Sequence, residues 1–139
     1  MKGIYLLVIE LDHDEHIEVG SLGELEFQNG LYVYVGSAQN GVESRVKRHL
    51  RDEKKKHWHI DYLLDHAEIS KVYALQGDKK DECATARYVN YIATPVPDFG
   101  ASDCSCNSHL FRYEGKRKYL YEGIENLPGV EEMKLESLQ

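Results

Sequence analysis

GIYLLVIEL at residues 3–11 and LYVYVGS at residues 31–37 are the two stretches that decide the fold of this chain. Both are rich in β-branched, aliphatic and aromatic residues, a composition typical of strands. An antiparallel pair is the simplest arrangement for two such strands. The segment between them, residues 12–30, is acidic and contains three glycines. It predicts a loop, with room for a short strand around Leu22 to Phe27.

Helices are predicted on the C-terminal side of the second strand. Val42, Val46 and Leu50 recur at four-residue spacing and form the apolar stripe of a helix that runs to about Arg51. Asp78 is suited to cap a later helix, because its side chain accepts hydrogen bonds from unpaired backbone N–H groups. That helix runs to about Ile92 and ends before Pro95 and Pro97. The other predicted elements are a helix from about His57, strands at Ile69–Leu75 and His109–Tyr113, a helix at Tyr119–Leu127 and an extended segment at Val130–Leu135.

These elements predict an α/β (α+β) fold with a small, mostly antiparallel three-stranded sheet flanked by helices. The length of 139 residues and the hydrophobic content of 42% suit one domain. We expect its core at about residues 1–113 and a C-terminal extension at 114–139. No apolar run reaches the roughly 18 residues of a membrane span, and the N-terminus lacks a secretory pattern. Three closely spaced cysteines suit a reducing compartment, so we expect a cytoplasmic protein without membrane contact.

The charge of the chain is unevenly distributed. The net charge is −7, which by itself argues against a nucleic-acid partner. Between Arg45 and Lys56, however, seven basic residues stand against two acidic ones. A charge run alone is most simply a solvated helix end. Combined with other signals, it predicts a basic surface that contacts phosphate on an otherwise acidic protein.

Four features of the sequence suggest chemistry when they are taken together. Gly3-Ile4-Tyr5 opens the first strand, and Tyr34-Val35-Gly36 closes the second. Arg45 and His49 are four residues apart on the next helix, so both project from one face. Glu82 lies near the start of the third helix. Each feature alone is most simply structural, but their joint order favours a site.

This ordered set resembles the GIY-YIG nuclease family, which includes homing endonucleases, some restriction enzymes and the incision domain of bacterial nucleotide-excision repair. The likeness covers roughly the first hundred residues. The string at residues 57–63, HWHIDYL, and the loop at residues 102–104 resemble a small stand-alone branch, sometimes fused to a DNA-repair glycosylase. The resemblance implies a GIY-YIG-like fold and an endonuclease that uses Mg²⁺ or Mn²⁺. Its partners would be nucleic acid, with DNA favoured over RNA, and a DNA-repair protein.

The resemblance also implies roles for individual residues. Tyr5 would take the proton of the attacking water, with Tyr34 and His49 positioning that water. Arg45 would bind phosphate oxygens and Glu82 would hold Mg²⁺, chemistry that guanidinium and carboxylate groups can perform. A phenol is a poor base at neutral pH, so Tyr5 would need a neighbouring cation. Substrate binding would fall to the residues around this set: Gly36, Ser37, Lys47, Arg48, His57 and His59.

Three features depart from the family pattern. The two motif tyrosines, Tyr5 and Tyr34, are separated by a connection much longer than usual, so residues 12–29 would be an insertion. An Asn expected after the third helix is replaced by Asp98-Phe99-Gly100, with Asn107 the nearest candidate downstream. The acidic net charge is also unusual for a protein that acts on a polyanion. A nucleic-acid-binding module that cleaves nothing, acting with a repair partner, is therefore the alternative function.

A second metal site is conceivable at Cys104, Cys106 and His109, since Zn²⁺ accepts thiolate and imidazole ligands. Their spacing is not among the common zinc pairings, and no fourth ligand is evident. The sequence therefore favours a packed, cysteine-containing loop over zinc. A zinc-stabilised interaction domain is a third interpretation, and it predicts stoichiometric zinc in the purified protein.

Overall fold

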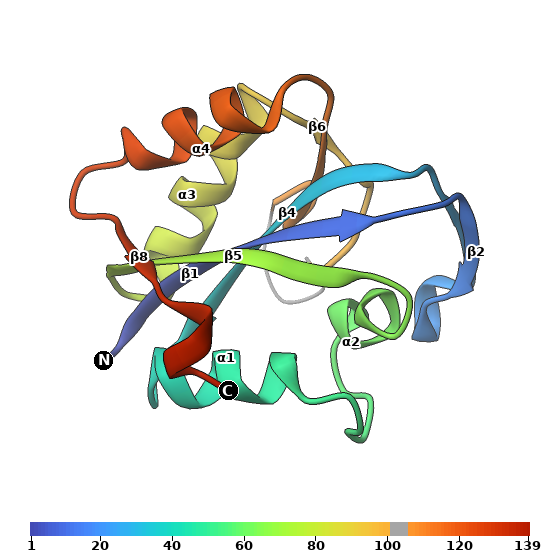
Figure 1. Cartoon of the computed structure of the whole chain (residues 1–139), viewed down its shortest axis with the longest axis horizontal. Coiled ribbons are helices and arrows are strands. Elements are labelled where there is room, and N and C mark those ends of the chain that lie inside the picture. The colour runs from blue at the N-terminus through green and yellow to red at the C-terminus, as the bar shows by residue number, and fades with distance from the viewer. Residues whose placement is uncertain (101–105) are drawn as a thin grey trace.

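The computed structural model describes residues 1–100 and 106–139, and these form a mixed α+β fold around one antiparallel sheet (Figure 1). In this part of the chain the sheet has six strands in the order β6-β7-β4-β1-β5-β8. Its strands are β1 (Gly3–Leu11), β4 (Gly30–Ala38), β5 (Glu68–Gln76), β6 (Thr94–Pro95), β7 (Leu110–Tyr113) and β8 (Glu131–Met133). A separate hairpin joins β2 (Glu15–Glu18) to β3 (Glu24–Phe27). The helices are α1 (Val42–Leu50), α2 (His59–Leu64), α3 (Lys79–Asn90) and α4 (Arg117–Glu125), with single 3₁₀ turns at Gly20–Leu22 and Leu135–Ser137.

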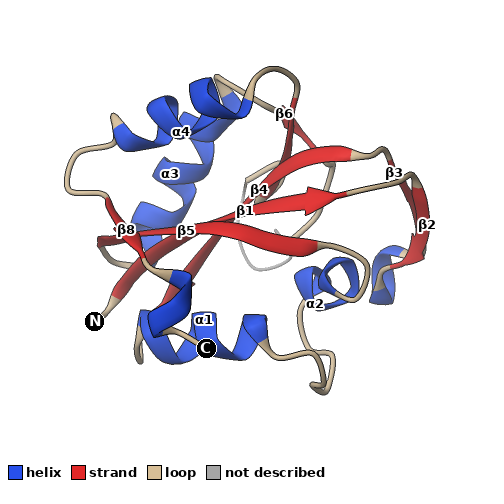
Figure 2. Ribbon diagram, viewed as in Figure 1, coloured by secondary structure: helices blue, strands red, loops and turns tan. Residues whose placement is uncertain are grey.

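The sheet is covered on both faces, by α1 and α2 on one side and by α3 and α4 on the other (Figure 2). Strand β1 lies in the middle and supplies both layers of the core. Tyr5 and Leu7 pack on the α1–α2 side, whereas Ile4 and Leu6 pack on the α3–α4 side. A strand buried on both faces needs apolar side chains at consecutive positions, which explains the unbroken run in β1. None of the described helices is long and apolar enough to cross a bilayer.

The prediction of a three-stranded sheet was wrong, because six strands pair in the described residues. The strands that the sequence located well, β1, β4 and β5, are nine residues long and form the centre. Strand β7 confirms the strand expected at His109–Tyr113, and β8 lies within the extended segment expected at Val130–Leu135. Strand β6 was not predicted, because its two residues are too few for a periodic pattern. The segment 12–30 is likewise more than a loop, since it contains the β2–β3 hairpin. The short strand expected within it is confirmed as β3.

The C-terminal segment contributes to both the sheet and the core. Helix α4 buries Leu120 and Ile124 in the layer that also contains Ile4 and Leu6. Strand β8 pairs antiparallel with β5, from Val72 opposite Met133. Leu138 is buried in the layer on the α1–α2 side. Residues beyond 113 thus contribute to the sheet and to both layers of the core.

Close packing of β1 against β4 depends on a missing side chain. The two strands pair antiparallel, as predicted, and Tyr5 lies directly opposite Gly36. A Cβ atom at residue 36 would overlap Cζ and the hydroxyl oxygen of Tyr5 and would lie 2.8 Å from Cε2. The Tyr5 ring therefore occupies the space that any larger residue at position 36 would need.

Replacing Gly36 with Ala should destabilise the protein by about 1–3 kcal/mol, the usual cost of overpacking a rigid core. Denaturant unfolding of wild type and Gly36→Ala measures this difference. The Tyr5→Leu background is the control, because a smaller side chain leaves room for the new methyl group. Gly36→Ala should cost clearly less there, and an equal cost in both backgrounds would contradict a clash with the ring.

Candidate active site

Two predicted site residues, Tyr5 on β1 and His49 on α1, meet in a direct hydrogen bond. The Tyr5 hydroxyl lies 2.8 Å from His49 Nε2, and both side chains are buried. The Tyr34 ring on β4 completes the group, with its centroid 6.4 Å from Tyr5 and 6.3 Å from His49. The sheet register and the apolar stripe of α1 thus bring together residues that are 44 positions apart in the chain.

Burial controls the protonation of this group. It raises the pKa of the Tyr5 phenol, and the Arg45 guanidinium opposes that rise only in part. Burial also raises the pKa of Tyr34 well above its usual value, with the Tyr5 and Glu82 charges adding to the effect. It lowers the pKa of His49 to about 3. At neutral pH both phenols are protonated and the imidazole is neutral, so Tyr5 can donate its proton to Nε2.

Arg45 lies at the edge of this group with its guanidinium held from two sides. It donates to the backbone oxygen of Ser37 at 3.1 Å. Its guanidinium carbon also lies 4.3 Å from the centroid of the Trp58 ring, a cation–π contact. Trp58 is half-buried, packs against the core on the α1–α2 side and provides the ring face on which Arg45 lies. Arg45 is itself half-buried, so its charge borders both the tyrosines and the solvent.

Glu82 projects from the first turn of α3 and is 6% exposed. Its carboxylate lies between two basic groups, with Lys79 Nζ 3.9 Å from Oε1 and His109 Nδ1 3.7 Å from Oε2. The negative charge of the same carboxylate contributes to raising the pKa of both Tyr5 and Tyr34. A single carboxylate fits Mg²⁺, because this ion keeps several waters and takes few protein ligands. Glu82 can therefore serve as the predicted magnesium ligand.

A buried ion pair that was not predicted from the sequence lies next to His49. Asp61 on α2 is fully buried and accepts from both terminal nitrogens of Arg48, at 2.9 and 3.0 Å. It also accepts from the backbone N–H groups of His57 and Trp58. Burial alone would raise the pKa of Asp61, but these hydrogen bonds outweigh it and lower the pKa to about 2. Asp61 Oδ1 also lies 4.0 Å from His49 Nδ1, a buried nitrogen without a hydrogen-bond partner among the described residues.

The residues predicted to bind substrate have different surroundings. Ser37 is half-exposed beside Arg45, and His57 is exposed with its ring 4.7 Å from that of Trp58. Lys47 is exposed on α1 and forms no hydrogen bond or ion pair within residues 1–100 and 106–139. Arg48 is engaged with Asp61, and His59 Nδ1 accepts the backbone N–H of Gly100 at 2.8 Å. Gly36, the sixth residue of this set, is buried under the Tyr5 ring.

At the second predicted metal site, the structure groups a set of residues that differs from the predicted one. Cys104 lies outside the described residues, but Cys106 and His109 come together with Cys83 of α3. Their candidate ligand atoms all lie within 4.8 Å of one another. The sequence analysis missed Cys83 because 23 residues separate it from Cys106 and no local spacing connects them. Its position on the same predicted helix as Glu82 is the signal in the sequence that could have identified Cys83.

Comparison with known proteins places the chain in a family without describing its activity. A family profile described as "Domain of unknown function DUF123" matches residues 4–130. The chain belongs to this family. The comparison with curated proteins and the comparison with solved structures both returned no match.

The low pKa of His49 predicts a specific loss of stability in mild acid. The unfolded imidazole takes a proton below about pH 6.5, whereas the folded one stays neutral until about pH 3. The free energy of unfolding should therefore fall as the pH drops from 6.5, by up to about 1.4 kcal/mol per pH unit. Urea unfolding between pH 7 and 4.5 measures the slope. His49→Gln should flatten it, whereas the exposed His16→Gln should retain the wild-type slope.

Removing the Asp61 charge should unfold the protein more readily at neutral pH. Asp61→Asn leaves the Arg48 guanidinium largely buried without its carboxylate, at a cost of about 2–4 kcal/mol. Asp65→Asn is the matched control, because its ion pair with Lys56 lies at the surface and contributes less than about 1 kcal/mol. Equal unfolding midpoints in urea for the two variants would contradict a larger contribution of the buried pair to stability.

Proposed function

We propose that this member of the DUF123 family is a metal-dependent endonuclease that hydrolyses phosphodiester bonds of nucleic acid, and that DNA is the preferred substrate. The observation that carries the proposal is the buried hydrogen bond between Tyr5 and His49. The charges of Arg45 and Glu82 both act on the pKa of Tyr5, with opposite sign. The resemblance of the motif residues to GIY-YIG nucleases supports the same chemistry.

The geometry suits a two-step proton relay. As water attacks the phosphorus atom, its proton passes to the phenolic oxygen of Tyr5, and the Tyr5 proton passes to His49 Nε2. A neutral imidazole is needed for this, and burial keeps His49 neutral. Burial also disfavours the resulting imidazolium, and Asp61, whose carboxylate Oδ1 lies 4.0 Å from Nδ1, offsets part of that cost. The relay avoids a free phenolate, which burial would make costly.

Charge neutralisation at the phosphate would come from two sides of the site. Arg45 is suited to bind phosphoryl oxygens, because guanidinium donors match their geometry. Glu82 would hold Mg²⁺ or Mn²⁺, which when bound neutralises the phosphoryl oxygens and stabilises the leaving oxyanion. Lys79 and His109 hold the Glu82 carboxylate in place for that role.

The substrate would approach over the exposed side of α1 and the segment that follows it. Basic side chains are concentrated there, between residues 45 and 56, on a chain with a net charge of −7. The exposed His57 ring lies next to Trp58 and is available to contact a base or a sugar. The acidic β2–β3 hairpin lies at the end of the sheet beside α2 and would repel a polyanion (Figure 1). Substrate is thereby directed to one side of the protein.

The test is cleavage of a labelled panel of duplex DNA, single strand, flap, junction and RNA, with Mg²⁺ or Mn²⁺. Wild type is compared with Tyr5→Phe and Glu82→Gln. Loss of the relay should reduce the rate by about 10²–10⁴-fold, the usual contribution of general acid–base catalysis. Loss of the metal ligand in Glu82→Gln should abolish the metal-dependent cleavage.

Tyr32→Phe is the matched control for Tyr5→Phe. Tyr32 is a buried tyrosine on β4 whose hydroxyl donates to the backbone oxygen of Gln28, so its loss removes a hydroxyl outside the site. It should cut at the wild-type rate. Binding without cleavage by wild type, unchanged in Glu82→Gln, would replace the nuclease by the binding module. Equal cutting by all variants would indicate a contaminating nuclease.

A further inference from the structure

We propose that Cys83, Cys106 and His109 bind a zinc ion next to Glu82. The inference rests on the juxtaposition of two thiols and an imidazole and does not depend on the proposed nuclease activity. Their candidate ligand atoms lie within 4.8 Å of one another, although they come from two distant segments. Tetrahedral coordination at metal–sulfur distances near 2.3 Å and metal–nitrogen distances near 2.0 Å requires only a small contraction of this group.

The fold brings these ligands together in a defined way. Cys83 lies in the first half of α3, and Cys106 and His109 lie in the segment that leads into β7. This segment is held by backbone hydrogen bonds, from His109 N to the Phe99 oxygen at 2.8 Å and from Val35 N to the His109 oxygen at 2.9 Å. The positions of the ligands are therefore set by the sheet and the helix rather than by a local motif.

The donor atoms select the type of metal. Thiolate and imidazole ligands favour Zn²⁺ and other soft or borderline ions, whereas Mg²⁺ prefers oxygen. Three protein ligands leave the fourth tetrahedral position for water. The Glu82 carboxylate, whose Oε2 is 3.7 Å from His109 Nδ1, would orient the imidazole ring of the metal-bound histidine. Glu82 would thus lie next to the zinc site without being one of its ligands.

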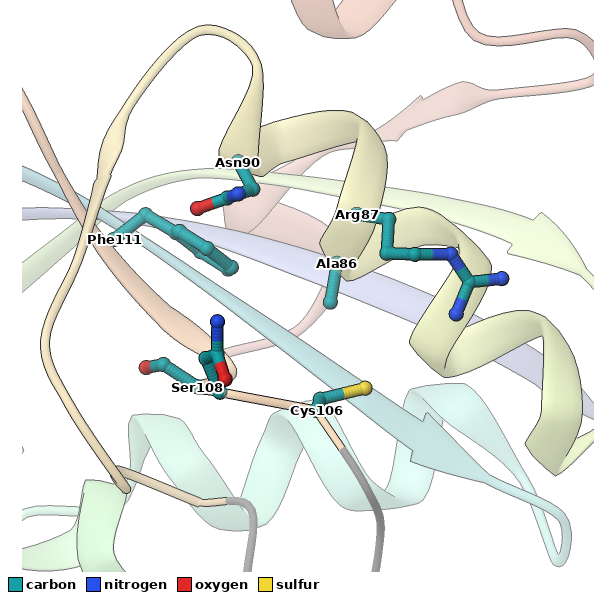
Figure 3. Close-up of a pocket in the computed structure, with 7 residues that line it drawn as sticks. Ala86, Arg87, Asn90, Cys106, Ser108 and Phe111 are labelled. Atoms are coloured by element: carbon teal, nitrogen blue, oxygen red, sulfur yellow. The ribbon is translucent and has the colours of Figure 1, made fainter.

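The site has an entry path. Cys106 lines a surface pocket of about 170 Å³ together with residues of α3, of the segment before β7 and of β7 itself. Figure 3 shows the Cys106 side chain extending from this segment toward α3, with Ala86 and Phe111 also bordering the pocket. His109, in contrast, is 1% exposed. A metal ion would therefore enter from the side of the thiols and would be shielded from solvent on the side of the imidazole.

The experiment measures zinc binding by full-length protein that has been stripped with a chelator and kept reduced. Titration against a chromophoric zinc indicator should give about one bound ion per chain. Cobalt substitution should produce a thiolate-to-metal charge-transfer band. Cys83→Ser and His109→Ala should each lower zinc affinity by at least about 10-fold, since each removes a ligand. Ala84→Ser is the matched control, because it introduces the same serine side chain at an exposed neighbouring position on α3. This variant should bind zinc as wild type does.

A second measurement uses the wild-type chain alone, so misfolding of a variant cannot hide the answer. Zinc should protect Cys83 and Cys106 from alkylation, as mapped by mass spectrometry. It should also raise the unfolding temperature by about 4 °C or more at saturating concentration. The proposal is overturned if reduced wild type binds no stoichiometric zinc, if Cys83→Ser binds it unchanged, or if zinc leaves the alkylation of both thiols unaltered.

Discussion

A polar hydroxyl inside a fully buried strand is the constraint on which the site depends. Tyr5 lies on the central strand of a sheet that is covered on both faces, so its hydroxyl must be hydrogen-bonded within the protein. His49 provides that bond, which fixes the rotation of α1 about its axis. With α1 fixed, Arg45 lies one turn earlier on the same face, over Trp58 and next to Ser37. One hydrogen bond thus links the packing of the core to the placement of the positive charge.

Local patterns predicted the centre of the molecule well. The long strands β1, β4 and β5 and the helices α1 and α3 each have a strong periodic or apolar signal, and Asp78 was correctly expected to precede α3. Strands β2 and β6 were not predicted, because they are short and depend on pairing with partners already in place. Tyr5, Tyr34 and His49 come from separate sequence motifs, and the structure brings their side chains together, while their roles stay predictions. Asp61 and Cys83 could not be found in this way, because their partners come from other elements and no spacing reveals them.

Part of the positive charge between residues 45 and 56 is paired within the protein. Arg48, which the sequence offers as a phosphate ligand, donates to the buried Asp61 carboxylate and to the Lys55 backbone oxygen. Its guanidinium carbon also lies 4.5 Å from the Trp58 centroid. Charge counting along a sequence therefore overestimates what a surface can offer to a ligand. The two arginines on Trp58 have different roles. Arg48 pairs with Asp61 and so links α1 to α2, whereas Arg45 forms no ion pair with a described residue and its charge opposes the rise in the pKa of Tyr5.

The two edges of the sheet bear on self-association. An exposed strand edge can pair with the edge of another molecule and start aggregation, and proteins avoid this with short strands, charges and proline. Here one edge is the two-residue strand β6, which contains Pro95, and the other is the three-residue strand β8, which contains Glu131 and Glu132. Both terminal strands of the six-stranded sheet therefore carry features that oppose edge-to-edge pairing. An assembly of several copies through the helical faces is favoured over one through these two strands.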